Sequence, residues 1–171
     1  MKKYLSLLFL CIIPTLSLWA IQGDITLNIP YYIGIHADGE DAGTALDYAF
    51  LVPEFKLTQY FGTGHIRAGI GVRMFTVILE TLVFPVISID ATINNFVFNA
   101  NVGGGAFLFF GLLNSVETEG IFIPEFTIAY KITDWFQAGT GINLFMYPGA
   151  TGDVSSFGYI PTVFGRFTFG N

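Results

Sequence analysis

The chain has 171 residues, of which 53% are hydrophobic, 17% aromatic and only 12% charged, and its formal net charge is −6. Soluble domains typically carry roughly 25% charged residues, so this composition argues against an ordinary water-exposed fold. The acidic balance gives no reason to expect a nucleic-acid partner. The length suits a single domain.

The first element in chain order is an export signal. Met1-Lys2-Lys3 is a short basic region, Tyr4–Leu18 is an apolar run of signal-peptide length, and Leu18-Trp19-Ala20 is a suitable cleavage site. We therefore expect residues 1–20 to be a cleavable signal peptide and residues 21–171 to form the exported domain.

The single cysteine lies within this signal. Cys11 follows the bulky Leu10 and the apolar run continues beyond it, which argues against a lipoprotein anchor at this position. After cleavage the chain would contain no cysteine, so neither a disulfide nor a thiolate metal site is expected.

The exported part has no uncharged apolar run of about 20 residues, the length that a membrane helix needs. Its apolar residues instead alternate with polar or small ones, which predicts strands with one apolar face. From Ile25 to Ile35 the odd positions are Ile, Leu, Ile, Tyr, Ile and Ile. Eight such segments follow one another: Ile25–Ile35, Ala49–Leu57, Ile66–Ile78, Val83–Ile93, Phe96–Phe110, Phe122–Ile132, Ala138–Met146 and Tyr159–Phe169.

The charged residues within these strands lie on the polar face. They are the basic Lys56, Arg67, Arg73, Lys131 and Arg166 and the acidic Glu54, Asp90 and Glu125. An apolar exterior around a polar interior is typical of a barrel dissolved in lipid, where closure leaves no unpaired sheet edge. The sequence therefore predicts an all-β fold, an eight-stranded antiparallel up-and-down transmembrane β-barrel, with these eight side chains forming an ion network in its lumen.

Connections of two lengths separate the strands. Phe61–Gly64, Asn94-Asn95 and Thr133–Trp135 are tight turns that would share one end, close to a girdle of aromatic residues. Ala37–Asp47, Gly111–Gly120 and Pro148–Ser156 are expected to be outer loops, with a short one near Leu79–Leu82. Several of these loops are acidic and offer a surface for an extracellular partner.

Four prolines interrupt the predicted strands on their lipid-facing side: Pro53, Pro85, Pro124 and Pro161. Proline cannot donate to a ladder. Counting from the turns places all four near the outer rim, where strands enter the sheet and water or a bulge covers the missing N–H group.

The predicted lumen has a polar lower zone and an apolar upper zone. The upper zone contains Phe50, Phe75, Phe84, Phe107, Phe109, Phe145 and Phe164. Because eight strands enclose a space that side chains can just fill, these rings favour a plug. A pocket for small apolar molecules is the alternative.

The pattern resembles the small eight-stranded outer-membrane barrels of the OmpA, OmpX and OmpW-like group. The end "VFGRFTFGN" is similar to the aromatic last strand of those proteins, with Gly165, Phe167 and Phe169 on one face, although Gly170-Asn171 follow the last aromatic. The resemblance implies a monomer in the outer membrane of a double-membraned bacterium, inserted by the assembly machinery that reads the last strand.

The resemblance also frames the function. A structural or surface-contact barrel without a cofactor is favoured, and an OmpW-like conduit or pocket for small apolar molecules is the alternative. A lipid A-modifying enzyme is least favoured, because His36, Asp38 and Ser155-Ser156 show no specific catalytic spacing. The acidic stretch Asp38–Asp41 lacks the ligand register of an EF-hand, so no metal site is expected.

Overall fold

The computed structural model describes residues 21–37, 39–62, 64–77, 80–104, 108–111, 122–146 and 156–170. The predicted signal peptide lies outside these residues. The described strands are β1 (Ile21–Pro30), β2 (Tyr32–Ala37), β3 (Glu40–Ala45), β4 (Val52–Phe61), β5 (Ile66–Val77), β6 (Glu80–Ile93), β7 (Phe96–Gly104), β8 (Leu108–Gly111), β9 (Phe122–Lys131), β10 (Phe136–Met146) and β11 (Ser156–Phe169). In the part of the chain that is described, no helix is long and apolar enough to cross a membrane.

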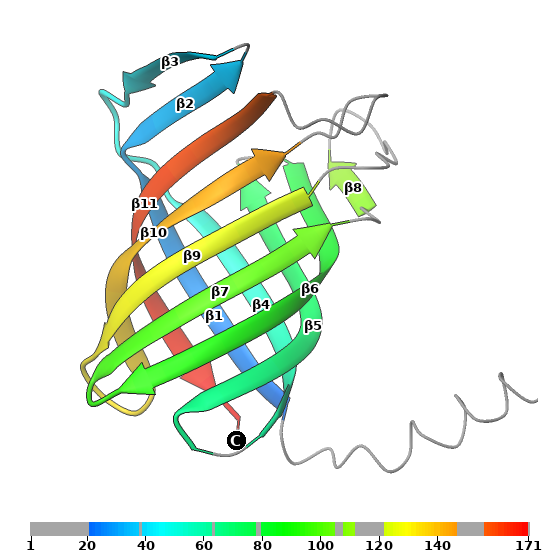
Figure 1. Ribbon diagram of the computed structural model, residues 1–171, viewed down its shortest axis with the longest axis vertical. Helices are drawn as coiled ribbons and strands as arrows, with labels where there is room; N and C mark the ends of the chain where they lie inside the picture. The colour runs from blue at the N-terminus through cyan, green and yellow to red at the C-terminus, as the bar shows by residue number, and fades with distance from the viewer. Residues whose placement is uncertain are drawn as a thin grey trace, which may run out of the picture.

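The strands form a closed antiparallel barrel (Figure 1). Each barrel strand pairs with its neighbours in the chain, and β1 pairs with β11 from Gly23↔Phe169 to Pro30↔Thr162, which closes the sheet. β2 continues the line of β1 and pairs with β11, while β8 continues the line of β7 and pairs with β6. The wall therefore has eight strands, as the sequence predicted.

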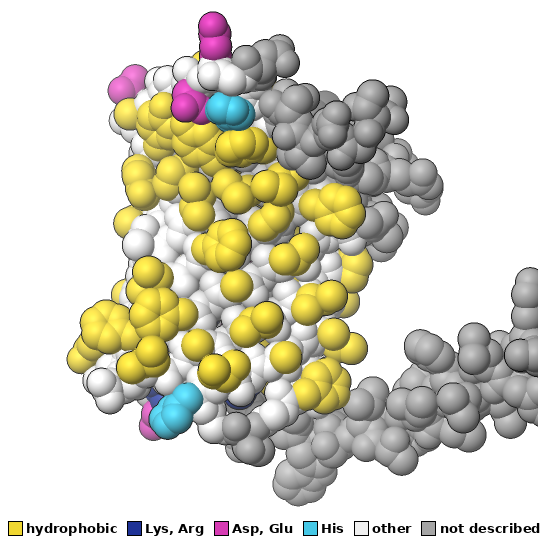
Figure 2. Space-filling model, viewed as in Figure 1, with side chains coloured by type: hydrophobic (Ala, Val, Ile, Leu, Met, Phe, Trp, Pro, Cys, Tyr) yellow, Lys and Arg dark blue, Asp and Glu magenta, His cyan; other side chains and the backbone are white. Residues whose placement is uncertain are grey.

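The period-two pattern separates the lumen from the exterior. On β1, Asp24, Thr26 and Asn28 are buried, whereas Ile25 and Leu27 are 42% and 36% exposed. The same alternation follows the other strands, and Figure 2 shows hydrophobic side chains across the barrel wall. This exterior is apolar and the interior is polar, which is the arrangement of a barrel embedded in lipid.

The tight connections occur where the sequence predicted them. The β4–β5 turn contains Gly62 and Gly64 with φ of 98° and 94°, and Asn94 in the β6–β7 turn has a φ of 54°, a conformation that glycine and asparagine tolerate best. Aromatic rings gather at this end: Phe167 lies against both Trp135 and Phe136, and Phe96 packs edge-on against Tyr130.

The predicted outer loop Ala37–Asp47 contains a strand that the sequence did not predict, β3. β2 and β3 form a hairpin with the register Tyr32↔Ala45 to Ala37↔Glu40, which rises beyond the barrel wall (Figure 1). All six residues of β3 are exposed. The segment "EDAGTA" has low strand propensity, so its conformation depends on pairing with β2, whose line extends past the rim.

Pro53 and Pro124 lie near the starts of β4 and β9, as expected, whereas Pro85 and Pro161 lie well inside β6 and β11. The strand-entry explanation is therefore wrong for the second pair. Both of these prolines lie where the ladder changes register. β6 pairs with β8 as far as Val83↔Leu108 and with β7 from Val86↔Gly103, so the partner strand changes beside Pro85.

A similar break accompanies Pro161. β11 pairs with β1 as far as Pro30↔Thr162 and with β2 from Gly34↔Tyr159, which leaves an extra residue on the β1–β2 side. The backbone N–H of Tyr31 donates to the carbonyl oxygen of Pro161 at 3.3 Å within this break. Bulges are sites where one strand lacks a ladder partner, so they tolerate a residue without an N–H group.

Candidate functional site: the polar lumen and the cavity above it

Arg73 on β5 joins opposite walls of the barrel. Its Nη2 donates to Glu54 Oε2 on β4 at 2.7 Å, to Glu125 Oε1 on β9 at 2.8 Å and to Asn143 Oδ1 on β10 at 2.9 Å. The arginine and both glutamates are buried. Charges removed from water require partners and hydrogen bonds to offset the cost of desolvation, and this arrangement supplies them across the full width of the lumen.

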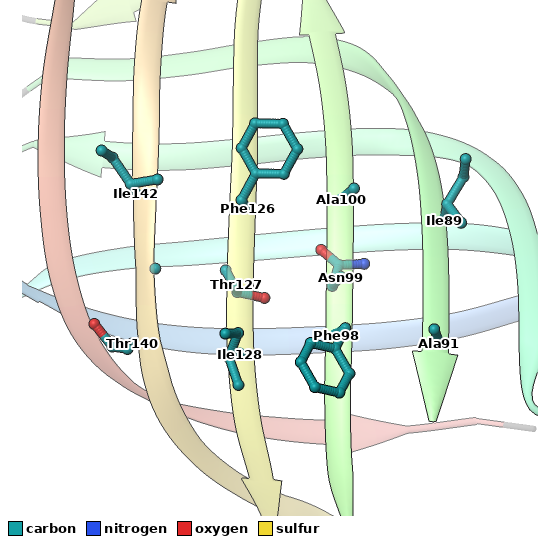
Figure 3. A pocket seen from close by; sticks show the side chains of 11 residues that line it. Ile89, Ala91, Phe98, Asn99, Ala100, Phe126, Thr127, Ile128, Thr140 and Ile142 are labelled. Atoms are coloured by element: carbon teal, nitrogen blue, oxygen red, sulfur yellow. The ribbon is translucent and has the colours of Figure 1, made fainter. Parts of the chain in front are cut away.

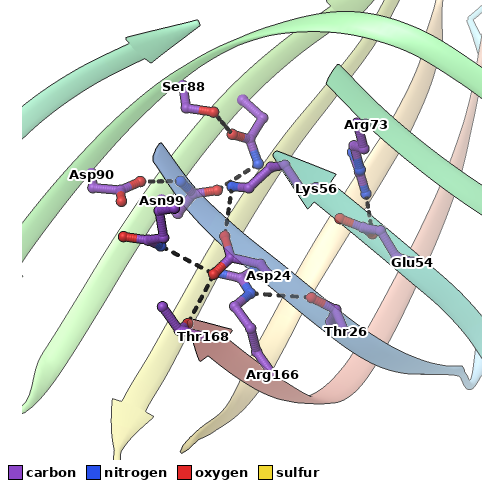
Figure 4. A network of polar contacts seen from close by, with 12 residues as sticks. Asp24, Thr26, Glu54, Lys56, Arg73, Ser88, Asp90, Asn99, Arg166 and Thr168 are labelled. Carbon is purple, nitrogen blue, oxygen red and sulfur yellow. Dashed lines mark hydrogen bonds and ion pairs between the residues drawn. The ribbon is translucent and has the colours of Figure 1, made fainter. Parts of the chain in front are cut away.

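A second group of contacts lies below Arg73 (Figure 4). Lys56 Nζ lies 3.7 Å from Asp24 Oδ2, and Thr168 Oγ1 donates to Asp24 Oδ1 at 2.8 Å. Arg67 Nη2 donates to Asp90 Oδ2 at 3.1 Å and to Gln22 Oε1 at 3.2 Å. The polar side chains thus continue from the centre of the barrel toward its turn end.

Amides connect the carboxylates of these two groups. Asn99 donates to Asp90, Asn101 donates to both Asn99 and Glu125, and Ser88 donates to Asn101. The chain of hydrogen bonds from Asp90 to Glu125 leads into the Arg73 cluster. A connected network of this kind favours one arrangement of the strands, because a shift in register would leave buried polar groups without partners.

The lumen network differs in three ways from the predicted set. Asp24 belongs to it but was missed, because the predicted first strand began at Ile25, one residue too late. Lys131 does not belong to it: its Nζ lies 2.9 Å from Asp134, a turn residue whose side chain is 98% exposed. Within the described residues Arg166 has no carboxylate at ion-pair distance; its Nε donates to Thr26 Oγ1 at 3.3 Å and its guanidinium lies over the ring of Phe164.

The corrected network is balanced in charge. Three of the five predicted cations, Lys56, Arg67 and Arg73, lie within 4 Å of a lumen carboxylate. The lumen carboxylates are Asp24, Glu54, Asp90 and Glu125, and the lumen cations are Lys56, Arg67, Arg73 and Arg166. Equal numbers of the two signs leave no net formal charge in the described lumen.

The upper aromatic residues fill only part of the space above Arg73. Phe84 is 1% exposed and packs against Ile123, with Phe75 and Phe145 beside it. Phe164 is placed elsewhere, in a separate cluster with Val97 and Ala129, so its assignment to the upper ring is wrong. Phe107 lies outside the described residues, and for Phe109 only the backbone is described, paired with Leu82.

A cavity of 170 Å³ remains in the upper lumen. Phe50, Phe75, Phe145, Val52 and Ile160 contribute most of its apolar wall. Polar side chains reach it from the centre of the barrel, namely Arg73, Glu54, Asn143, Asn28 and Thr162. In the described upper lumen, side chains therefore fill the space around Phe84 and leave space beside Ile160.

The exterior also carries a groove, which lies away from the lumen. It has a volume of 530 Å³ and crosses β6, β7, β9 and β10, where Ala91, Ala100 and Gly141 lie among larger side chains such as Phe98 and Phe126 (Figure 3). Ala91, Ala100, Phe98 and Phe126 belong to the outward-facing set of their strands, whereas Gly141 has lumen parity, like its ladder partners Thr127 and Thr162. In a membrane this surface contacts acyl chains, so the groove is part of the lipid-facing wall.

The described residues show no catalytic arrangement around His36, the residue on which the enzyme alternative depends. His36 Nδ1 lies 2.7 Å from Asp41 Oδ1, and the imidazole ring stacks on Phe157. Asp41 is largely exposed. Asp38 and Ser155 lie outside the described residues, and only the backbone of Ser156 is described, paired with Ala37. Among the described side chains no group of three or more His, Cys, Asp or Glu residues could hold a metal ion.

No protein-family model matches the chain, and no curated protein sequence matches it. Several solved structures have a similar fold. Neisserial surface protein A is 7% identical, with 88% of this chain and 97% of that chain covered and a TM-score of 0.49. Ail, the attachment invasion locus protein of Yersinia pestis, solved with the heparin analogue sucrose octasulfate, is 12% identical over 87% and 99% of the two chains, with a TM-score of 0.44.

The outer membrane protein OprG from Pseudomonas aeruginosa is 10% identical over 88% of this chain and 95% of that chain, with a TM-score of 0.40. These likenesses concern the fold alone. The barrel architecture itself rests on the strand pairing, and the site rests on the contacts described above.

Proposed function

We propose that residues 21–171 form an integral outer-membrane barrel of a double-membraned bacterium, exported by residues 1–20 and inserted through its aromatic last strand. Its role is non-enzymatic: the barrel anchors the chain in lipid and presents its outer end to the surroundings. The β2–β3 hairpin is the described part of that end, and Glu40 and Asp41 give it an acidic, exposed surface.

The proposed barrel has a closed lumen, and one observation carries that part of the proposal: Arg73 bonds β4, β9 and β10 across the lumen. A continuous passage would have to separate Arg73 from Glu54, Glu125 and Asn143, which together close the lumen at this height. The barrel is therefore closed at mid-height and does not act as a pore.

Planar-bilayer recording tests the closed lumen. The refolded mature chain, confirmed as folded by its heat-modifiable mobility on gels, should insert without producing discrete conductance steps. A known open porin prepared in the same detergent serves as the positive control. Regular steps from the wild-type barrel would overturn the closed-lumen proposal, and recovery of the mature chain as a soluble periplasmic protein would overturn its membrane location.

A pocket for a small molecule is the second candidate function. It is supported by the 170 Å³ cavity on the outer side of Arg73, because apolar cavities with a few converging polar groups are the usual form of small-molecule sites. The two candidates are compatible, since a closed barrel with an outward pocket neither conducts ions nor passes its ligand through the lumen.

A further inference from the structure

The upper lumen is built from two copies of one sequence unit. "VPEF" (Val52–Phe55) precedes "AGIGVRMF" (Ala68–Phe75), and "IPEF" (Ile123–Phe126) precedes "AGTGINLF" (Ala138–Phe145). The first unit occupies β4 and β5, the second occupies β9 and β10, and these hairpins lie on opposite sides of the eight-stranded wall. The two units therefore face each other across the lumen.

The strand that follows each unit continues the correspondence. Arg73 pairs with Phe84 on β6, and Asn143, at the equivalent place, pairs with Ile160 on β11. A proline comes next in both strands, Pro85 and Pro161. Phe84 and Ile160 are therefore equivalent positions on the two sides of the lumen.

The size difference between these two side chains accounts for the cavity. Phe84 fills its side by packing on Ile123. On the other side the smaller Ile160 stands with Val52, and the space beside them is the 170 Å³ cavity. Cavities of about 150 Å³ with apolar walls accept a benzene-sized molecule, so this one has room for a single small ring.

Arg73, which contributes to the polar floor of the cavity, has donors that no described residue uses. Arg73 uses Nη2 for its three bonds, while Nε and Nη1 are buried and have no hydrogen-bond partner among the described residues. Buried donors without partners are costly. Both atoms are enclosed, so an acceptor atom in the cavity would reach one of them through a small turn of the guanidinium and would remove that cost. The charge balance of the lumen favours a neutral molecule over an ion.

We propose that this cavity binds a small neutral molecule with an apolar ring-sized body and one acceptor oxygen directed at Arg73. The inference deepens the second candidate function and rests on it. Recognition has two parts: Ile160 in place of a larger residue leaves the space, and an N–H group of Arg73, turned toward the cavity, selects the oxygen.

Two probes of nearly equal shape separate these parts. Acetophenone carries a carbonyl oxygen where α-methylstyrene carries a CH2 group. Titration of each into the refolded mature protein, with methyl NMR as the readout, should give saturable shifts at Ile160 and Val52. The methyl group of Ile87, which faces outward and is 61% exposed, reports partition into detergent and should not saturate. Acetophenone should bind about tenfold more tightly, the effect of one hydrogen bond to a charged donor.

Ile160→Phe should abolish the saturable shifts, observed at Val52, because it restores the bulk that Phe84 has on the other side. Val163→Phe is the matched control: it adds a ring to the same strand at an outward position that is 45% exposed, and binding should persist. The probe comparison on the wild-type protein tests the inference even if Ile160→Phe fails to fold.

Absence of saturable binding of both probes by the wild-type protein would overturn the inference, as would unchanged binding by folded Ile160→Phe. Equal affinity for the two probes would overturn the role of Arg73. The bilayer recording is independent of all three results. Failure of the binding tests would leave the closed-lumen proposal intact, and conductance steps would overturn the closed-lumen proposal without testing the pocket.

Discussion

Arg73 on β5 and Glu125 on β9 form an ion pair across the lumen, with Nη2 and Oε1 2.8 Å apart. They are separated by 52 residues in the chain and belong to strands that do not pair with each other. The contact therefore connects two strands that share no backbone hydrogen bonds. Its loss should lower the stability of the whole barrel.

Arg73→Ala should lower the free energy of unfolding by about 3–5 kcal/mol, because it leaves two carboxylates buried without their cation. Urea unfolding in detergent micelles, followed by the loss of heat-modifiable mobility, measures the change. Lys131→Ala is the control, since its partner Asp134 is exposed and such surface pairs contribute at most about 1 kcal/mol. Equal effects of the two substitutions would contradict the central role of Arg73.

Proline at position 85 should be replaceable at little cost. Pro85→Ala restores an N–H group beside a register change, and we expect a change in unfolding free energy below about 1 kcal/mol. Ile87→Pro should cost about 3 kcal/mol or more, because Ile87 pairs on both sides, with Ile70 and with Val102. The folded fraction after refolding gives the comparison, and a severe defect in Pro85→Ala would count against the bulge explanation.

Gly71 should not tolerate a side chain. A Cβ added there would overlap the carbonyl oxygen of Leu57 on the neighbouring strand, so the backbone would have to move. Gly71→Ala should destabilise the barrel by about 1–3 kcal/mol, the usual cost of overpacking. At Gly158 the nearest atom would be Phe145 Cβ at 3.7 Å, an ordinary contact. Urea midpoints of Gly71→Ala and Gly158→Ala should therefore differ, and equal midpoints would refute the steric argument.

The β9–β10 turn offers a prediction on pH. The hydrogen bond from Lys131, together with its charge, lowers the pKa of Asp134 below the usual value. A lowered pKa means that the contact stabilises the folded turn above the ordinary aspartate pKa and is lost as pH falls through the lowered one. Lys131→Met should raise the pKa of Asp134 toward its ordinary value in a carboxyl NMR titration, whereas Lys131→Arg should keep it low. No change in Lys131→Met would exclude this pairing in solution.

Alternation in the sequence was sufficient to predict the eight wall strands and the face on which the charges within the predicted strands lie, but Asp24 fell just before the first of them. Alternation could not predict how high a side chain sits or which partner it meets. Lys131 has lumen parity, yet its position beside the turn lets it reach Asp134. Arg73 and Glu125 share the polar face of their strands, but their contact depends on the stagger of the barrel, which a pattern of residues along one strand does not contain.

The cavity and the β2–β3 hairpin also depend on three-dimensional features that the residue pattern of one strand does not contain. The upper aromatic residues suggested a plug because eight strands leave little room, but the space left depends on the size of Ile160 relative to Phe84 at equivalent ladder positions. The β2–β3 hairpin was missed because "EDAGTA" has the composition of a loop. β3 forms because β2 extends past the rim of the barrel and offers it a strand to pair with. How far β2 extends depends on the assembled barrel wall.

The polar contacts at the junction of β1 and β11 bear on how the molecule is assembled. Thr168 donates to Asp24, and Arg166 donates to Thr26, across the seam between the first and last strands. These contacts join residues more than a hundred positions apart, and closing so long a loop is slow. Until the seam closes, Asp24 and Arg166 would have to remain hydrated, because hydrocarbon cannot accommodate them. Pairing of the first and last strands and the removal of these charges from water are thus one cooperative step. Until that step is complete, a sheet entering the membrane needs a water-filled environment around its open edges.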